Sequence, residues 1–177
     1  NYFKTAKNVS ADFIVDDNTI VQYNPDIKNR YCWHCGGAKY NNKGGSFFGK
    51  CTNANSIGIE ICCNNSTRKM QNANDKSYSF TEAALNNALI LINKLMQQYN
   101  IPKENVIRHY DVNGKPCPGI IGWNAESGSE CEWFNFKAKI QNTKSAETKS
   151  DKLFTVQVGA FANKENAEKF LKEVQKN

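Results

Sequence analysis

Three residues capable of metal and proton chemistry lie in one short stretch, RHYDVNGKPCPG, at residues 108–119. His109 and Cys117 are soft metal ligands, and Lys115 lies just before the cysteine. A zinc ion held by a neutral imidazole and a thiolate remains a Lewis acid while another protein ligand and water fill its other positions. The stretch therefore indicates a zinc site, although a surface histidine and a buried cysteine would give the same spacing.

A single carboxylate marks the run NSIGIEICC at residues 55–63. Apolar side chains alternate there with small or polar ones, as expected of a strand with one apolar face. The apolar positions are Ile57, Ile59 and Ile61, and the intervening ones are Gly58, Glu60 and Cys62. Glu60 is thus the only carboxylate on its face, either facing a site or facing solvent.

The elements that must position these side chains can be read from the pattern. ADFIVDDNTIVQYNP predicts a β-hairpin with strands at residues 13–15 and 19–23. Polar residues dominate 36–55, which predicts a long loop beside a cleft. TEAALNNALILINKLMQQYN, residues 81–100, predicts an amphipathic helix capped by Thr81. VIRHY then predicts a buried strand delivering His109 to its loop, so we expect an α/β fold with a mixed central β-sheet flanked by α-helices.

The composition of the sequence changes near residue 141. The stretch QNTKSAETKSDK has no large apolar residue and predicts a flexible linker at 141–152. LFTVQVGAF then alternates as a strand does, and NKENAEKFLKEVQKN begins a helix. We therefore expect residues 1–140 to form one domain and residues 153–177 to be the first part of a second domain that is cut short.

Composition narrows the classes of partner. The 177 residues carry a net charge of +6, which suits an anionic cell-wall polymer as well as nucleic acid. No block of Lys and Arg or aromatic platform favours nucleic acid, and no apolar run is long enough to cross a bilayer. The chain begins at Asn1 without an initiator Met, so we expect its amino terminus to be truncated.

Seven cysteines are an odd number, so at least one is outside any intramolecular disulfide. If Cys117 binds metal, six remain, and their pairing cannot be read from the sequence; they could equally be reduced cysteines packed as small hydrophobic residues. Cys32 and Cys35 form a CxxC pair. No βαβ pattern surrounds it as in a thioredoxin-like site, and no second pair completes a zinc knuckle, so a redox or structural zinc protein is a minor alternative.

HYDVNGKPCPG closely resembles the zinc-binding segment of the type 2 N-acetylmuramoyl-L-alanine amidases, which include phage lysozyme-amidases and are related to the peptidoglycan recognition proteins. NSIGIEICCNN resembles the core strand of the subgroup with a catalytic glutamate, and ADFIVDDNTIVQYNPDIKNRYCWHCGG resembles the family's hairpin and Trp-His segment. LFTVQVGAFANKENAEKFLKE resembles the opening strand and helix of a sporulation-related repeat (SPOR) domain, a peptidoglycan-binding module.

The resemblance implies roles for particular residues. It implies that His109 and Cys117 are two of three zinc ligands, that Lys115 is catalytic and that Glu60 is the catalytic acid. Family members carry the third ligand, a histidine, on a strand ahead of the hairpin, so we expect it upstream of Asn1 in a first strand that is missing here. His34 is then expected to line the substrate cleft, and its alternative role is that of the third ligand. Ala11 occupies the position at which some relatives have a catalytic tyrosine. The resemblance therefore favours Glu60 as the catalytic acid.

The activity implied is zinc-dependent hydrolysis of the amide between N-acetylmuramic acid and L-alanine in peptidoglycan. Glu60 would move the proton, and zinc with Lys115 would stabilise the oxyanion. We expect a monomer that acts outside the cell on the wall, as an endolysin or an autolysin, without nucleic acid or membrane insertion. Within the same fold, the alternative is a peptidoglycan-binding protein without catalysis.

Overall fold

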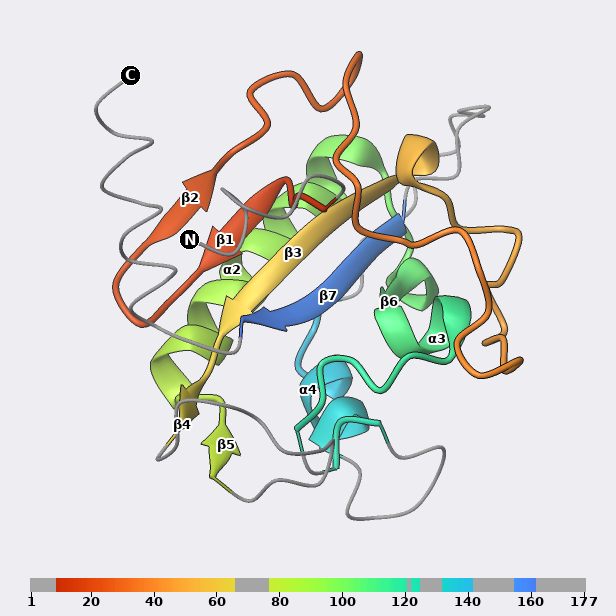
Figure 1. The fold of residues 1–177 in the computed structure, drawn as a ribbon. Coiled ribbons are helices and arrows are strands. Elements are labelled where there is room, and N and C mark those ends of the chain that lie inside the picture. The colour runs from red at the N-terminus through yellow and green to blue at the C-terminus, as the bar shows by residue number, and fades with distance from the viewer. Residues whose placement is uncertain (1–8, 66–76, 121, 125–131, 142–154, 162–177) are drawn as a thin grey trace.

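The fold is built on a mixed five-stranded sheet. A computed structural model of the chain describes residues 9–65, 77–120, 122–124, 132–141 and 155–161. Its central sheet has the order β2-β1-β3-β7-β6 (Figure 1). These strands are β1 (Phe13–Val15), β2 (Ile20–Gln22), β3 (Ser56–Cys62), β6 (Val106–Arg108) and β7 (Thr155–Phe161). Only β2 is antiparallel to its neighbour, and the other pairs are parallel, so the expected mixed α/β sheet is confirmed.

The predicted hairpin is confirmed as β1 and β2. Val15 pairs with Ile20, and the Asp16 carboxylate closes the turn between them. Its Oδ1 accepts hydrogen bonds from the backbone N–H groups of Asn18 at 2.8 Å and Thr19 at 2.7 Å. An aspartate that bonds the backbone two and three residues on is a common turn former, which explains why this sequence reverses here.

The predicted helix is confirmed as α2 (Glu82–Tyr99). Thr81 accepts a hydrogen bond from the Ala84 N–H at 3.1 Å, and Asn100 ends the helix in the left-handed conformation at φ 53°. The buried face of the helix packs with β1 and β3 in the main core, and α2 runs behind these strands in Figure 1. Its fully buried residues are Ala84, Ala88, Leu91, Ile92, Leu95 and Met96.

The prediction that a strand extends to Tyr110 is wrong, because a helix begins at His109. β6 ends at Arg108, and α3 (His109–Asn113) follows at once. The carboxylate of Asp111, the third residue of the helix, accepts from the Arg108 backbone N–H at 2.8 Å, as the N3 residue of a capping box does. Gly114, at φ 82°, then ends the helix. His109 therefore occupies the first position of a short helix.

β7 lies between β3 and β6 although it comes last in the sequence. Val156 and Val158 join the main core on one face, and Gln157 is buried on the other. These residues belong to the stretch predicted to begin a second domain, yet their strand is part of the central sheet. The domain boundary itself stays a prediction, and the helix predicted after residue 161 lies outside the described residues.

Shorter elements complete the described structure. They are β4 (Asn64–Asn65), β5 (Tyr78–Ser79), α4 (Glu132–Ala138) and the 3-10 turns Asn53–Asn55 and Lys103–Asn105. The predicted loop at 36–55 is regular only in its last residues, where the first of these turns lies. Among the described helices, none combines the length and apolar character needed to cross a bilayer.

Candidate active site

Glu60 lies on the polar face of β3, opposite the isoleucines that enter the core. It pairs with Gly159 of β7, and its carboxyl group lies against that glycine. A Cβ atom at Gly159 would come within 2.5 Å of the Glu60 Oε1, so a larger residue there would collide with the carboxyl group. Burial raises the pKa of the Glu60 carboxyl to about 7, and the positive charge of Lys115 opposes part of the rise. A carboxyl group with this pKa can accept and release a proton near neutral pH.

His109 is held in one orientation by a backbone carbonyl. Its Nε2 lies 3.0 Å from the carbonyl oxygen of Cys35, which can only accept a hydrogen bond. The proton of the neutral ring therefore lies on Nε2, and Nδ1 keeps its lone pair. Burial and the nearby charge of Lys115 lower the pKa of His109 to about 4, so the ring is neutral at physiological pH. This is the form of histidine that binds a metal ion.

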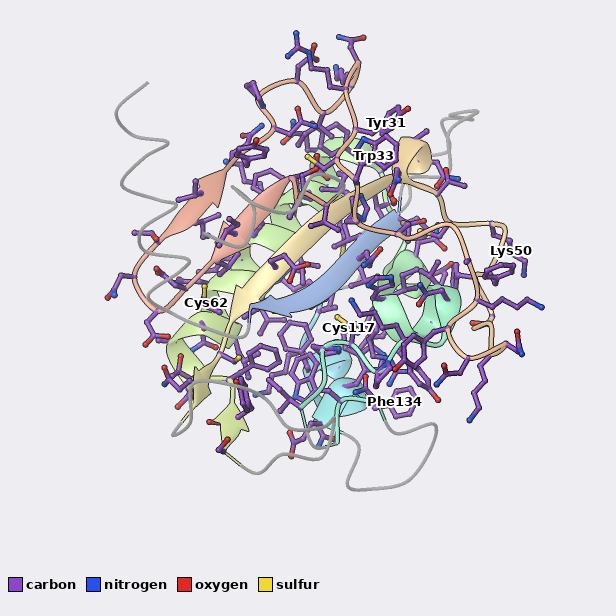
Figure 2. All side chains as sticks on the ribbon, in the orientation of Figure 1. Tyr31, Trp33, Lys50, Cys62, Cys117 and Phe134 are labelled. Carbon is purple, nitrogen blue, oxygen red and sulfur yellow. The ribbon has the colours of Figure 1, made fainter. Side chains whose placement is uncertain are left out.

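The loop after α3, which carries Cys117 (labelled in Figure 2), is hydrogen-bonded to the start of that helix. The backbone carbonyl of Cys117 accepts from the Tyr110 N–H at 3.2 Å, and the Cys117 N–H donates to the Lys115 carbonyl at 2.7 Å. The Lys115 N–H in turn donates to Asn113 Oδ1 at 3.0 Å. These bonds hold Cys117 beside the first turn of α3, where His109 lies, and its side chain is half-buried.

Lys115 connects the predicted residues electrostatically. Its charge acts on the pKa of both Glu60 and His109, which come from different elements, so the ammonium group lies near both. Glu60 lies on β3, whereas His109 and Lys115 come from α3 and the loop after it. The individual roles predicted for them stay predictions.

The donor set fits part of a zinc site. His109 offers a neutral ring with a fixed tautomer, and its Nε2–H bond to a carbonyl is the usual outer partner of a metal-binding histidine. Cys117 offers a sulfur atom on the neighbouring loop. Among the described residues no group of three or more His, Cys, Asp or Glu side chains is arranged to hold a metal ion. The zinc-ligand roles of His109 and Cys117, and the identity of a third ligand, therefore stay predictions.

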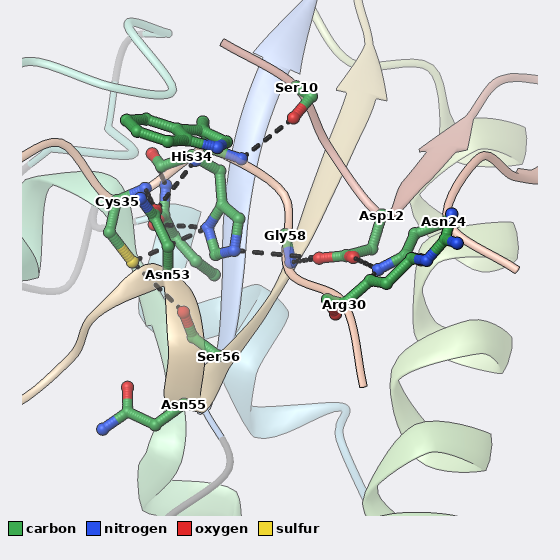
Figure 3. A network of polar contacts seen from close by, with 12 residues as sticks. Ser10, Asp12, Asn24, Arg30, His34, Cys35, Asn53, Asn55, Ser56 and Gly58 are labelled. Carbon is green, nitrogen blue, oxygen red and sulfur yellow. Dashed lines mark hydrogen bonds and ion pairs between the residues drawn. The ribbon is translucent and has the colours of Figure 1, made fainter. Parts of the chain in front are cut away.

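His34 is buried in a polar network beside β3 (Figure 3). Its Nδ1 lies 3.1 Å from Gln157 Oε1, while the Gln157 amide donates to the His34 carbonyl at 3.2 Å. Its Nε2 lies 3.7 Å from the Asp12 carboxylate. Burial lowers the pKa of His34, and the negative charge of Asp12 opposes that shift. His34 is only 7% exposed, so substrate could reach it only if the surrounding chain moved. Both of its predicted roles, in the substrate cleft or as third ligand, stay predictions.

Sequence analysis missed the other members of this network. Asp12 Oδ2 accepts from the Gly58 N–H at 2.7 Å, and Asp12 Oδ1 accepts from the Asn24 side chain at 2.7 Å. A Cβ atom at Gly58 would lie 2.6 Å from the His34 ring, so only glycine permits this packing. A glycine inside a strand often marks such a close approach, and it is the one signal that could have revealed the network.

A separate cavity of about 660 Å³ lies between the loop at 43–47, α3 and α4. Basic and aromatic side chains line it, among them Lys43, Lys137, Tyr110 and Phe134. None of the predicted site residues lines this cavity. Its lining includes Arg108 and Tyr110, the two chain neighbours of His109.

Comparison with known proteins identifies the class. Residues 1–120 match the family described as N-acetylmuramoyl-L-alanine amidase, and residues 135–177 match the SPOR domain. The first match covers more than half of the chain, and the chain belongs to the N-acetylmuramoyl-L-alanine amidase family. The two matched stretches meet in one sheet, because β7 pairs with β3 and β6.

Individual relatives agree with this assignment. The N-acetylmuramoyl-L-alanine amidase CwlH of Bacillus subtilis (strain 168) is 39% identical over 118 residues, which are 66% of this chain and 38% of CwlH. The amidase XlyA of the same organism is 38% identical over 109 residues, 62% of this chain and 29% of XlyA. A solved structure of PlyL superposes with a TM-score of 0.52 and 32% identity, covering 80% of this chain and 72% of that one. The aligned part of this chain thus spans less than two fifths of these curated relatives.

Proposed function

We propose that this chain hydrolyses the amide bond between N-acetylmuramic acid and L-alanine in peptidoglycan and acts in the cell wall. The observation that carries the proposal is geometric: the Glu60 carboxyl lies against the Gly159 backbone, and a backbone carbonyl fixes the His109 ring beside the loop that holds Cys117. The family to which the chain belongs supports the same reaction.

In this proposal, His109 and Cys117 hold a zinc ion, which would supply Lewis acidity toward water and the scissile carbonyl. Glu60 accepts the proton of the attacking water and passes it to the nitrogen of the departing L-alanine. Lys115 stabilises the negative charge that develops on the carbonyl oxygen. One water is consumed, the C–N bond breaks, and a carboxylate on the muramic acid and a free amine on the peptide result.

The surroundings of Glu60 support its role as the proton carrier. The carboxyl group lies against the backbone of Gly159, and no side chain at that position can cover it. Its raised pKa allows it to be ionised before attack and protonated afterwards near pH 7. The neighbouring ammonium of Lys115 favours the ionised form, which is the form that accepts the proton of water.

The SPOR match supports peptidoglycan as the partner, and we propose that the chain works as a monomer at the cell wall. Attachment to an insoluble polymer raises the effective concentration of the attached site. Peptidoglycan binding without catalysis is the second candidate, because the described residues contain no group of three or more side chains arranged to hold a metal ion.

The test uses purified peptidoglycan incubated with the protein, with and without a zinc chelator. We expect free amino groups to appear without new reducing sugar, and the chelator to abolish their release. New reducing sugar would identify a glycosidase instead. Binding to peptidoglycan without release of either product would favour the second candidate.

A further inference from the structure

Two cysteines outside the proposed catalytic residues lie in direct contact. Cys35 follows the Trp-His segment and Cys51 lies in the long loop at 36–55, and their Sγ atoms are 3.3 Å apart. Cys35 is 0% exposed and Cys51 is 4% exposed. The sequence did not indicate this pair, since it favoured no partner for either cysteine.

The surroundings hold both sulfur atoms in place. The pair packs with Ile107 and Val112 in a small apolar cluster that is separate from the main core. The Ser56 hydroxyl lies 3.2 Å from the Cys35 sulfur, and the Cys35 N–H donates to the Asn53 side chain at 2.8 Å. Both cysteines are therefore fixed by neighbours on β6, α3 and the start of β3.

The two cysteines differ in their exposure. Cys51 is 4% exposed and Cys35 is 0% exposed, so a dissolved oxidant meets Cys51 first. The thiolate is the species that attacks a disulfide.

We propose that Cys35 and Cys51 form a reversible disulfide when the protein meets a disulfide oxidant. The Cys51 thiolate attacks one sulfur of a low-molecular-weight disulfide, and the first thiolate of that oxidant leaves. Cys35 then loses its proton and attacks the Cys51 sulfur, which releases the second thiolate and completes the bond. Two protein thiols are oxidised and one oxidant disulfide is reduced to two thiols. The sulfurs must approach by roughly 1.2 Å to reach the usual bond length.

This bond would close the loop at 36–50 into a ring beside the proposed zinc ligand. The Cys35 carbonyl already accepts the hydrogen bond from His109 Nε2. The same loop pairs with α3, since the Gly45 N–H donates to Val112 at 3.0 Å and the Phe47 N–H donates to Asp111 at 2.9 Å. The disulfide would therefore fix the backbone that orients His109. The inference is independent of the proposed activity, because the bond can be measured without peptidoglycan.

The first test maps disulfides in the whole chain after equilibration with oxidised glutathione or with dithiothreitol. The protein is then denatured in an alkylating agent and digested. In the oxidised sample we expect two fewer reactive thiols and a linked peptide pair containing Cys35 and Cys51. Full alkylation of all seven cysteines, or a link that joins Cys32 to Cys35, would overturn the proposal.

A second measurement compares melting temperatures of the two samples. Closing a loop of this size should raise the melting temperature of the oxidised protein by about 5–10 °C. The difference should vanish in Cys51→Ser and persist in Cys62→Ser, a control that removes another buried thiol. An equal difference in both variants would overturn the proposal. Mapping on the unaltered chain keeps the test valid if Cys51→Ser does not fold.

Discussion

The two faces of β3 are both covered by protein but carry different chemistry. On one face Ile57, Ile59 and Ile61 are 0% exposed and pack in the main core with α2. On the other, Gly58 supports the buried His34 ring, and Glu60 presents a carboxyl group against Gly159. Gly58 and Gly159 lack a side chain at these two contacts, which leaves space for the His34 ring and the Glu60 carboxyl. The apolar face instead fills its space with isoleucine side chains. Alternate residues of β3 thus serve different purposes: the isoleucines stabilise the fold, and the residues between them face the proposed site.

The largest expected effect on stability comes from the apolar face of β3. Ile59→Ala removes buried methyl groups and should lower the free energy of unfolding by about 3 kcal/mol. The carboxyl on the opposite face keeps its neighbours, so hydrolysis per folded molecule should stay close to that of the unaltered protein. Chemical denaturation together with the amino-group assay measures both. A loss of turnover as large as that from a Glu60 variant would mean that the two faces are not separable.

The next prediction concerns Lys115 and affects the rate of hydrolysis without affecting stability. Lys115→Ala removes a charge close to Glu60 and His109 and should slow hydrolysis roughly a hundredfold, the usual loss for one oxyanion donor. Because Lys115 is exposed, unfolding stability should change little. Lys94→Ala, at an exposed position on α2, is the matched control and should leave the rate unchanged. Equal rates for both variants would remove Lys115 from the mechanism.

The smallest effect is a pH dependence of stability. The pKa of Glu60 is about 7 in the folded protein, above its ordinary value near 4.5, so burial disfavours the ionised form. The stability from Glu60 is therefore fully present below about pH 4.5 and is lost as the pH rises through about 7. Glu60→Gln cannot ionise, so its stability relative to the unaltered protein should increase across this range. Denaturation at several pH values tests this, and a pH-independent difference would contradict the assigned pKa.

Local patterns predicted the parts of the fold that depend on local physics. The Asp16 turn, the alternation in β3 and the capped apolar face of α2 were all readable, because each arises from residues close in sequence. The start of a helix at His109 was missed, because the Asp111 cap lies beyond the short apolar run that suggested a strand. The position of β7 between β3 and β6 is a long-range pairing, which no local pattern specifies.

The candidate site likewise has residues that the sequence suggested and contacts that only the structure reveals. Residue types suggested Glu60, His109, Lys115 and Cys117, and Lys115 acts electrostatically on two of the others. The carbonyl of Cys35 that orients His109 could not be predicted, because a backbone group carries no signature in the sequence. The contact between Cys35 and Cys51 was equally invisible, since the pairing of seven cysteines cannot be deduced from their spacing.

The most direct test of the account measures peptidoglycan hydrolysis by Glu60→Gln beside Glu82→Gln, an exposed control on α2. The central claim is that the polar face of β3 carries the group that moves the proton. We predict that Glu60→Gln stays folded and loses about a thousandfold in rate, within the range for general acid–base catalysis, while Glu82→Gln keeps full activity. A folded Glu60→Gln protein that hydrolyses peptidoglycan as fast as the control would contradict the account.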